Sequence, residues 1–324
     1  MSKIAIIVGD CGQDGTLLRA SLESQGVEII GVGRDRVSMP QHISANWPRE
    51  MSIDDAEQVS ALLQAVRPNE IYYLAAHHNS SERSEVDNSP SEYEIYHRTH
   101  VVGLLNFLWA IRRYSPHSRL FYAASSLVFS GIHGPIQNED TQFTPHGYYG
   151  LTKAQGIMIC REFRRSHGVF AAAGILYNHE SVLRSDKFLS KKIISSAHNI
   201  SLGLEDEIIL GNLAAETDWG YAPEYIEAFQ RILRINTPDD FVVASGESHS
   251  VAEFAQIVFS CFDLDFQKYV VENPGMLNRI VPRKVGDNSK LKIATGWTPT
   301  LNFENMVRKL VNDYLECGGY NLVS

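Results

Sequence analysis

Residues 4–15 read IAIIVGDCGQDG, an apolar run followed at once by a glycine-rich turn. The apolar run predicts a buried strand, and Gly9, Gly12 and Gly15 come directly after it. Glycines at this spacing allow a tight turn, a close approach of the backbone to a ligand, and close packing of the next helix. The N–H groups at the start of that helix would then face a pyrophosphate, so we expect a dinucleotide here.

The rest of the first half alternates β-rich runs with helical patterns, which is typical of βαβ units and a parallel sheet. The predicted strands are Ile4–Val8, Val27–Val32, Glu70–Ala75, Leu120–Ala124 and Phe170–Leu176. The predicted helices are Thr16–Ser24, Ala56–Val66, His100–Tyr114 and Tyr149–Ser166. Because the strand runs are almost wholly apolar, we expect helices on both faces. The predicted fold is an α/β, Rossmann-type, doubly wound parallel sheet.

After about Tyr177 the strand-like runs become shorter and the polar loops longer. We therefore expect a Rossmann domain at residues 1–177 and a smaller substrate-binding region at residues 178–324. The short strand-like runs of the second region include Glu207–Leu210 and Phe241–Ala244, and we expect that some of its segments return to the main sheet.

The composition excludes several classes of protein. The 324 residues carry 38 acidic and 29 basic side chains, a formal charge of −9, which argues against nucleic-acid binding. The four cysteines lie far apart, without metal-binding spacing, so we expect free thiols and no metal site. No run approaches the ~18 apolar residues that span a membrane. We expect a cytoplasmic protein.

The residues after the second predicted strand bear on the choice of cofactor. Arg34, Asp35 and Arg36 follow Gly33. An acid at this place favours a free ribose hydroxyl, as in NAD, whereas an arginine favours the 2′-phosphate of NADP. Because Arg34 is the first side chain past the strand, we predict NADP(H).

Tyr149 and Lys153 lie four residues apart, on one face of a predicted helix. A lysine near a phenol favours the phenolate and makes the tyrosine a usable proton donor and acceptor. Upstream, Ser125 and Ser126 end a predicted strand, at the edge where α/β proteins bind ligands. With a nicotinamide nearby, these groups could move a proton while a hydride moves.

This arrangement resembles the extended short-chain dehydrogenase/reductase superfamily. Later motifs resemble the GDP-mannose 4,6-dehydratase family in particular: GILYNHES at residues 174–181, LGNL at 210–213 and DWG at 218–220. The GQDG of the first turn and the runs PDDFV and GESHSV at residues 238–242 and 246–251 are further matches. The resemblance extends from about Lys3 to about Leu315. It implies a GDP-linked nucleotide sugar as substrate and a homodimer or homotetramer.

The resemblance also implies roles for individual residues. The expected catalytic residues are Ser126, Tyr149 and Lys153. The residues expected to contact the cofactor, besides Tyr149 and Lys153, are Gly9, Gly12, Gln13, Asp14 and Gly15 at its phosphates, Arg34 at the 2′-phosphate, Leu74, Ala75 and Ala76 at the nicotinamide ribose, and His179 near the nicotinamide. The residues expected to contact the substrate are Asn178, Glu180, Lys191, Lys192 and Asn212.

Three positions depart from the family pattern. Val128, or Leu127 in a shifted alignment, stands where the family has the glutamate that takes the C5 proton. Thr217 replaces a basic residue, and Ser52 replaces the aspartate expected at the adenine pocket. Dehydration needs a base at C5, and a valine cannot be one.

Hydride transfer at C4 needs only the serine, the tyrosine, the lysine and the cofactor. The sequence therefore favours a 4-keto reductase or a C4 dehydrogenase acting on a GDP-linked hexose. One alternative is a GDP-mannose 4,6-dehydratase with a relocated base, such as Glu139 or Asp140. Another is an inactive, cofactor-binding partner protein.

Overall fold

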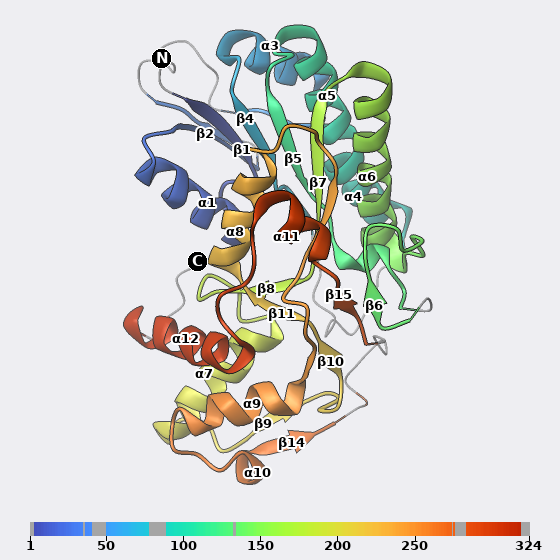
Figure 1. Cartoon of the computed structure of the whole chain (residues 1–324). Coiled ribbons are helices and arrows are strands. Elements are labelled where there is room, and N and C mark those ends of the chain that lie inside the picture. The colour runs from blue at the N-terminus through green and yellow to red at the C-terminus, as the bar shows by residue number, and fades with distance from the viewer. Residues whose placement is uncertain are drawn as a thin grey trace.

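The computed structural model describes residues 3–34, 36–40, 50–77, 89–131, 134–273, 275 and 283–318. Its central feature is a seven-stranded sheet in the order β12-β7-β5-β4-β1-β2-β3 (Figure 1). These strands are β1 (Ile4–Val8), β2 (Glu28–Gly33), β3 (Arg36–Ser38), β4 (Glu70–Tyr73), β5 (Arg119–Ala123), β7 (Phe170–Leu176) and β12 (Asp240–Val243). All neighbours pair in parallel except β3, which runs antiparallel to β2.

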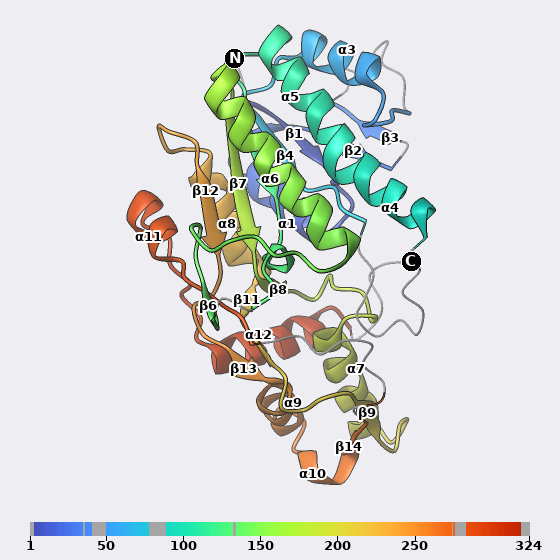
Figure 2. The same ribbon diagram turned by 90° about the vertical axis from the view of Figure 1, so that its right-hand side faces the viewer.

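Helices cover both faces of this sheet, as Figure 2 shows. The helices on one face are α3 (Ala56–Val66), α4 (Pro90–His97), α5 (Gly103–Tyr114) and α6 (Gly147–His167). A π-helical turn, η1 (Arg98–Val102), joins α4 to α5. The helices on the other face are α1 (Gln13–Ser24), α8 (Ala222–Ile232) and α11 (Ser289–Thr295). The expected doubly wound, Rossmann-type fold is thus confirmed.

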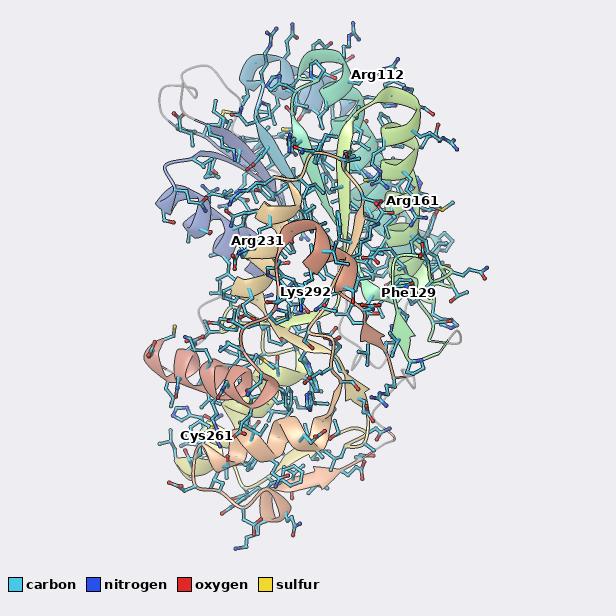
Figure 3. The ribbon with its side chains drawn as sticks, viewed as in Figure 1. Arg112, Phe129, Arg161, Arg231, Cys261 and Lys292 are labelled. Atoms are coloured by element: carbon cyan, nitrogen blue, oxygen red, sulfur yellow. The ribbon has the colours of Figure 1, made fainter. Side chains whose placement is uncertain are left out.

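The sheet strands are buried on both sides, which explains their continuous apolar sequences. Two separate apolar cores lie against the two faces. Phe107 and Ile157 belong to the core under α5 and α6, whereas Leu18 and Phe229 belong to the core under α1 and α8. Figure 3 shows Arg161 on α6 and Arg231 on α8, on opposite sides of the sheet.

A smaller lobe lies below the sheet in Figure 1 and has its own apolar core. Its helices are α7 (Leu189–Ser201), α9 (Val251–Ser260), α10 (Phe266–Tyr269) and α12 (Phe303–Glu316). Three short strand pairs accompany these helices. They are β8 (Asn178–Glu180) with β11 (Trp219–Tyr221), β9 (Ile208–Leu210) with β14 (Val270–Glu272), and β10 (Glu216–Thr217) with β13 (His249–Ser250). A further pair, β6 (Ile136–Gln137) with β15 (Val285–Gly286), lies beside the main sheet.

The chain leaves the sheet after β7, forms part of the lobe, and returns through α8 and β12. Strand β12 pairs with β7 along Asp240–Val243 and extends the main sheet. The two parts of the molecule are therefore not two consecutive pieces of sequence. None of the helices in the described ranges is long and apolar enough to cross a membrane.

Candidate active site

A cleft of about 720 Å³ opens at the carboxyl ends of the parallel strands. It lies where β1 and β4 are neighbours and the chain winds away from them in opposite directions, which is the usual ligand site of a doubly wound sheet. Residues at the strand ends line it: Val8 is the last residue of β1, and Leu74, Ala124 and Tyr177 directly follow β4, β5 and β7.

The glycine turn forms one end of the cleft. Gly9 has a φ of +93°, and a Cβ atom at this position would lie 2.8 Å from the backbone nitrogen of Ala75. A Cβ atom on Gly15 would lie 2.3 Å from the carbonyl oxygen of Gly9. Both positions therefore require glycine, because any side chain would push the turn away from the sheet. The turn leaves the first N–H groups of α1 at the cleft, where they suit a pyrophosphate.

All of the residues expected to contact the cofactor line the cleft. They are Gly9, Gly12, Gln13, Asp14, Gly15, Arg34, Leu74, Ala75, Ala76, Tyr149, Lys153 and His179. Arg34 is exposed at the cleft, whereas Asp35 lies outside the described residues. A cleft that joins a glycine turn, an arginine and a Tyr/Lys pair has donors that fit a nicotinamide dinucleotide.

The side chains of Gln13 and Asp14 differ from the expectation. Instead of facing only the cleft, they reach across to the segment around β8. Asp14 pairs with Nε2 of His179 at 3.0 Å, and Gln13 donates a hydrogen bond to the carbonyl oxygen of His179 at 3.2 Å. The resemblance implies that these residues contact the phosphates, and both also line the cleft.

Tyr149 and Lys153 both lie on α6 and line the cleft. Burial raises the pKa of Tyr149 to about 12, although a hydrogen bond with Ser125 acts in the lowering direction. Burial lowers the pKa of Lys153 to about 7. The ammonium group donates to the carbonyl oxygen of Ala123 at 2.7 Å and lies 5.8 Å from the centre of the Tyr149 ring. Tyr149 is therefore a neutral phenol near pH 7, rather than the phenolate that the sequence argument favoured.

The serine at the cleft is Ser125, not Ser126. Ser125 lines the cleft and hydrogen-bonds Tyr149, whereas Ser126 is buried and does not line it. Ser126 begins a 3₁₀ turn, η2 (Ser126–Val128), in which each residue is rotated by about a third of a turn from the one before it. Consecutive side chains therefore point in different directions, and the sequence alone does not show which serine faces the ligand.

Four of the five residues expected to contact the substrate lie away from the cleft. Only Asn178 lines it. Glu180 is buried and accepts hydrogen bonds from Arg184 at 3.1 Å and Ser190 at 2.5 Å. The positions of the other three are set by backbone contacts within the lobe: Lys191 donates to Val182, Lys192 donates to Ile209, and Asn212 accepts from Ala214.

The cleft also contains charged residues that the sequence analysis did not single out. Arg184 lines it and packs over the ring of Phe188, with its guanidinium carbon 4.2 Å from the ring centre. Asp54 and Arg98 also line the cleft and form an ion pair with each other. Arg184 follows β8 by four residues, in a loop that has no periodic pattern, so its position could not be inferred from spacing.

Position 128 is a core position. Val128 has no exposed surface and belongs to the apolar core under α5 and α6. Glu139 and Asp140, the two candidate replacement bases, do not line the cleft. Glu139 accepts a hydrogen bond from the backbone of Val242 at 2.7 Å. Among the described residues, the acids lining the cleft are Asp14, paired with His179, and Asp54, paired with Arg98.

A doubly wound sheet whose cleft joins a glycine turn to a Tyr-x-x-x-Lys pair is the arrangement of the short-chain dehydrogenases/reductases of the extended type. Comparison with known proteins supports the same class of protein. The family model described as GDP-mannose 4,6 dehydratase matches residues 6–310. The chain belongs to the GDP-mannose 4,6-dehydratase family.

Relatives from distant organisms match nearly the whole chain. GDP-mannose 4,6 dehydratase 2 of Arabidopsis thaliana is 32% identical over 97% of this chain and 87% of its own length. GDP-mannose 4,6 dehydratase of Homo sapiens is 32% identical over 97% of this chain and 91% of its own length. In structure, RMD from Pseudomonas aeruginosa, complexed with NADPH, covers 98% of this chain and 100% of its own with a TM-score of 0.79. At 17% identity, that likeness shows the fold alone.

Proposed function

We propose that the protein is an NADP(H)-dependent enzyme that transfers a hydride at C4 of a GDP-linked hexose. The observation that carries this proposal is the contrast between the three polar residues at the cleft and the residue at position 128. Tyr149, Lys153 and Ser125 line the cleft, whereas Val128, at the position where the resemblance implies a C5 base, is buried in the apolar core. This contrast supports proton transfer at C4, because among the described residues the acids that line the cleft, Asp14 and Asp54, are both paired.

The cofactor would lie along the cleft, with its phosphates at the turn that contains Gly9 and Gly15 and its 2′-phosphate near Arg34. When bound, it would supply or accept the hydride. Ser125 and Tyr149 would then face the C4 oxygen of the sugar. Because burial keeps Tyr149 protonated, the phenol can donate its proton to that oxygen, and the carbonyl, having gained a hydride and a proton, becomes the alcohol.

The substrate would enter from the lobe side, where Asn178 and Arg184 line the cleft. We propose that residues 178–324 mainly bind the nucleotide sugar, except for α8 and β12, which complete the sheet. The cation of Arg184 suits the diphosphate of a GDP-sugar. The family resemblance further implies a homodimer or homotetramer, and we propose that its subunits pack through α6.

The second candidate is a complete GDP-mannose 4,6-dehydratase. The observation in its favour is the similarity to relatives at 32% identity, which are named GDP-mannose 4,6 dehydratases. It requires a C5 base other than Glu139 or Asp140, because neither lines the cleft.

One experiment separates the two candidates. The purified protein is incubated in D₂O with GDP-mannose and NADP⁺, and separately with GDP-4-keto-6-deoxymannose and NADPH. We expect NADPH oxidation and a reduced sugar in the second reaction, and neither a 6-deoxy product nor deuterium at C5 in the first. Rapid C5 deuteration with release of the 4-keto-6-deoxy sugar from GDP-mannose would establish the dehydratase instead. An absence of turnover in both reactions, with NADPH bound, would indicate the inactive, cofactor-binding alternative.

A further inference from the structure

A set of hydrogen bonds, called the polar bridge below, joins Gln13 and Asp14 of the glycine turn to His179 and Ser181 around β8. From the first turn of α1, Asp14 contacts Nε2 of His179 through both carboxylate oxygens, at 3.0 and 3.1 Å. Gln13 donates to the carbonyl oxygen of His179 at 3.2 Å and to Asp14 at 3.0 Å. Ser181 donates to the side-chain oxygen of Gln13 at 2.8 Å. Two consecutive residues of the turn thus hold the segment that begins at β8.

The hydrogen bonds of His179 define its charge. Nδ1 lies 2.8 Å from the carbonyl oxygen of Tyr177, and Nε2 lies against the Asp14 carboxylate. Both partners are acceptors, so each ring nitrogen must carry a hydrogen, and only the imidazolium does so. The ring also stacks on Tyr225 of α8, with centres 4.7 Å apart, which fixes its plane.

The bridge lies where a cofactor's pyrophosphate is expected. Asp14 is the second residue of α1, so its carboxylate stands beside the N–H groups that suit a phosphate. A lone carboxylate at that place would repel the pyrophosphate, whereas a carboxylate paired with an imidazolium presents little net charge.

We propose that Asp14 and His179 are positioning residues that form a charge-compensated bridge between the phosphate-binding turn and the lobe-side segment of the cleft. This inference rests on the proposed function, because it assumes that a nicotinamide dinucleotide binds at the glycine turn. The imidazolium cancels the charge of Asp14, so the turn keeps its link to β8 without repelling the cofactor. Deprotonation of His179 would restore the repulsion.

Charged and titratable groups surround the pair on several elements. Arg184, in the loop after β8, acts electrostatically on Asp14 and His179. Tyr149 and Lys153 of α6 interact with Asp14 from the other side of the cleft. Tyr225 covers the ring from α8, and Gly220 of β11 lies opposite His179 in the strand pair. From β8 itself, Glu180 is paired with Arg184.

The direction of titration agrees with this geometry. Burial and the Arg184 charge lower the pKa of His179, but the Asp14 carboxylate outweighs them, so its pKa is raised above the usual 6.5. Burial would raise the pKa of Asp14, yet the contact with His179 lowers it to about 2. The pair is therefore charged at neutral pH and loses its proton from His179 as the pH rises.

The test measures NADPH affinity by fluorescence titration between pH 6.5 and 9 in four proteins: unmodified, His179→Gln, Asp14→Asn and the double variant. Glutamine keeps a neutral donor for Asp14 but removes the positive charge. We expect His179→Gln to weaken NADPH binding about tenfold at pH 7, a typical coupling between contacting charges. Asp14→Asn in the same chain should recover most of that loss, because no carboxylate is then left uncompensated.

The pH dependence gives a second measurement. In the unmodified protein, NADPH affinity should fall as the pH rises through the pKa of His179. That fall should be reduced in His179→Gln and in Asp14→Asn, each of which keeps Lys153, whose pKa of about 7 also makes it titrate in this range. Ser181→Ala is the matched control, since it removes a neutral hydrogen bond of the same bridge. It should weaken binding less than about threefold and leave the pH profile unchanged.

Three outcomes would contradict the proposal. They are an unchanged NADPH affinity in His179→Gln, a double variant that binds NADPH no better than His179→Gln, and a pH dependence of NADPH affinity that is identical in all four proteins. If His179→Gln does not fold, as judged by thermal denaturation, Asp14→Asn alone still tests the pH dependence. Failure of the proposed function would look different, because the unmodified protein would then bind no nicotinamide dinucleotide at any pH.

Discussion

Lys153 on α6 donates a hydrogen bond from its ammonium group to the carbonyl oxygen of Ala123, the last residue of β5, at 2.7 Å. Only 1% of the lysine is exposed, and burial brings its pKa down to about 7. An ionisable group is thus buried among apolar strands, where its charged form is disfavoured at a cost in stability. Such a cost is expected where a side chain is placed for chemistry rather than for packing.

The first prediction is that folding stability rises with pH because of Lys153. Between pH 7 and the unfolded value of about 10.4, the unfolded chain keeps the lysine proton and the folded chain does not. The unfolded state then binds more protons, so raising the pH favours the folded state, by up to about 1.4 kcal/mol per pH unit. Lys153→Met should remove this contribution. Urea unfolding of both proteins at pH 7, 8 and 9 measures it, and parallel profiles would contradict the prediction.

The second prediction concerns Tyr149. Tyr149→Phe keeps the ring but removes the proton donor, so turnover should fall at least ~100-fold while NADPH affinity changes little. Tyr148→Phe is the control, because the neighbouring tyrosine does not line the cleft and its loss should leave turnover within about threefold. The readout is NADPH oxidation with a 4-keto GDP-sugar. Near-normal turnover of Tyr149→Phe would show that this tyrosine is not the acid.

The third prediction concerns the choice between NADPH and NADH. Arg34 is exposed at the cleft, whereas Arg36 is directed to Cys11 and Asp10. Arg34→Ala should weaken NADPH binding about tenfold or more, the usual effect of losing a charged hydrogen bond to a phosphate, and leave NADH binding nearly unchanged. Arg36→Ala should have a smaller effect on the ratio of the two affinities. Equal affinity of the unmodified protein for both cofactors would refute the prediction.

The fourth prediction concerns Val128. Because this side chain is fully buried among apolar neighbours, Val128→Glu should cost about 3 kcal/mol or more of folding stability, since a longer polar side chain must enter a filled apolar core. It should not create dehydratase activity, since the new carboxyl would stay protonated in that environment. Val128→Thr, of nearly the same shape, should cost less, about 1–3 kcal/mol. A Val128→Glu protein as stable as the unmodified one would show that position 128 has access to solvent.

The features that the sequence predicted well are those set by local geometry. Gly9 and Gly15 are required by a turn a few residues long, and their spacing predicted it. Tyr149 and Lys153 share one face of a helix, so four residues of spacing brought both to the cleft. The apolar strand runs likewise predicted a sheet covered on both sides.

The features that the sequence did not predict depend on contacts between distant segments. Whether Ser125 or Ser126 faces Tyr149 depends on a 3₁₀ turn that the letters Ser-Ser do not specify. The burial of Lys191 is determined by the packing of α7 against α12, where its ammonium lies 4.6 Å from the ring centre of Tyr314. Asp14 was expected at a phosphate, and its partner His179 lies 165 residues further along the chain.

The return of the chain to the sheet through β12 has a consequence for any attempt to divide the molecule. A fragment ending after Tyr177 would lack both β12 and α8, leaving the hydrogen-bonding edge of β7 and the ring of Phe121, which stacks on Phe229, open to water. Such a fragment should aggregate rather than fold. For the same reason, the lobe of a relative cannot be grafted onto this sheet as one contiguous cassette. A chimera must exchange the segments on either side of α8 and β12 together and leave that helix and strand in their original protein.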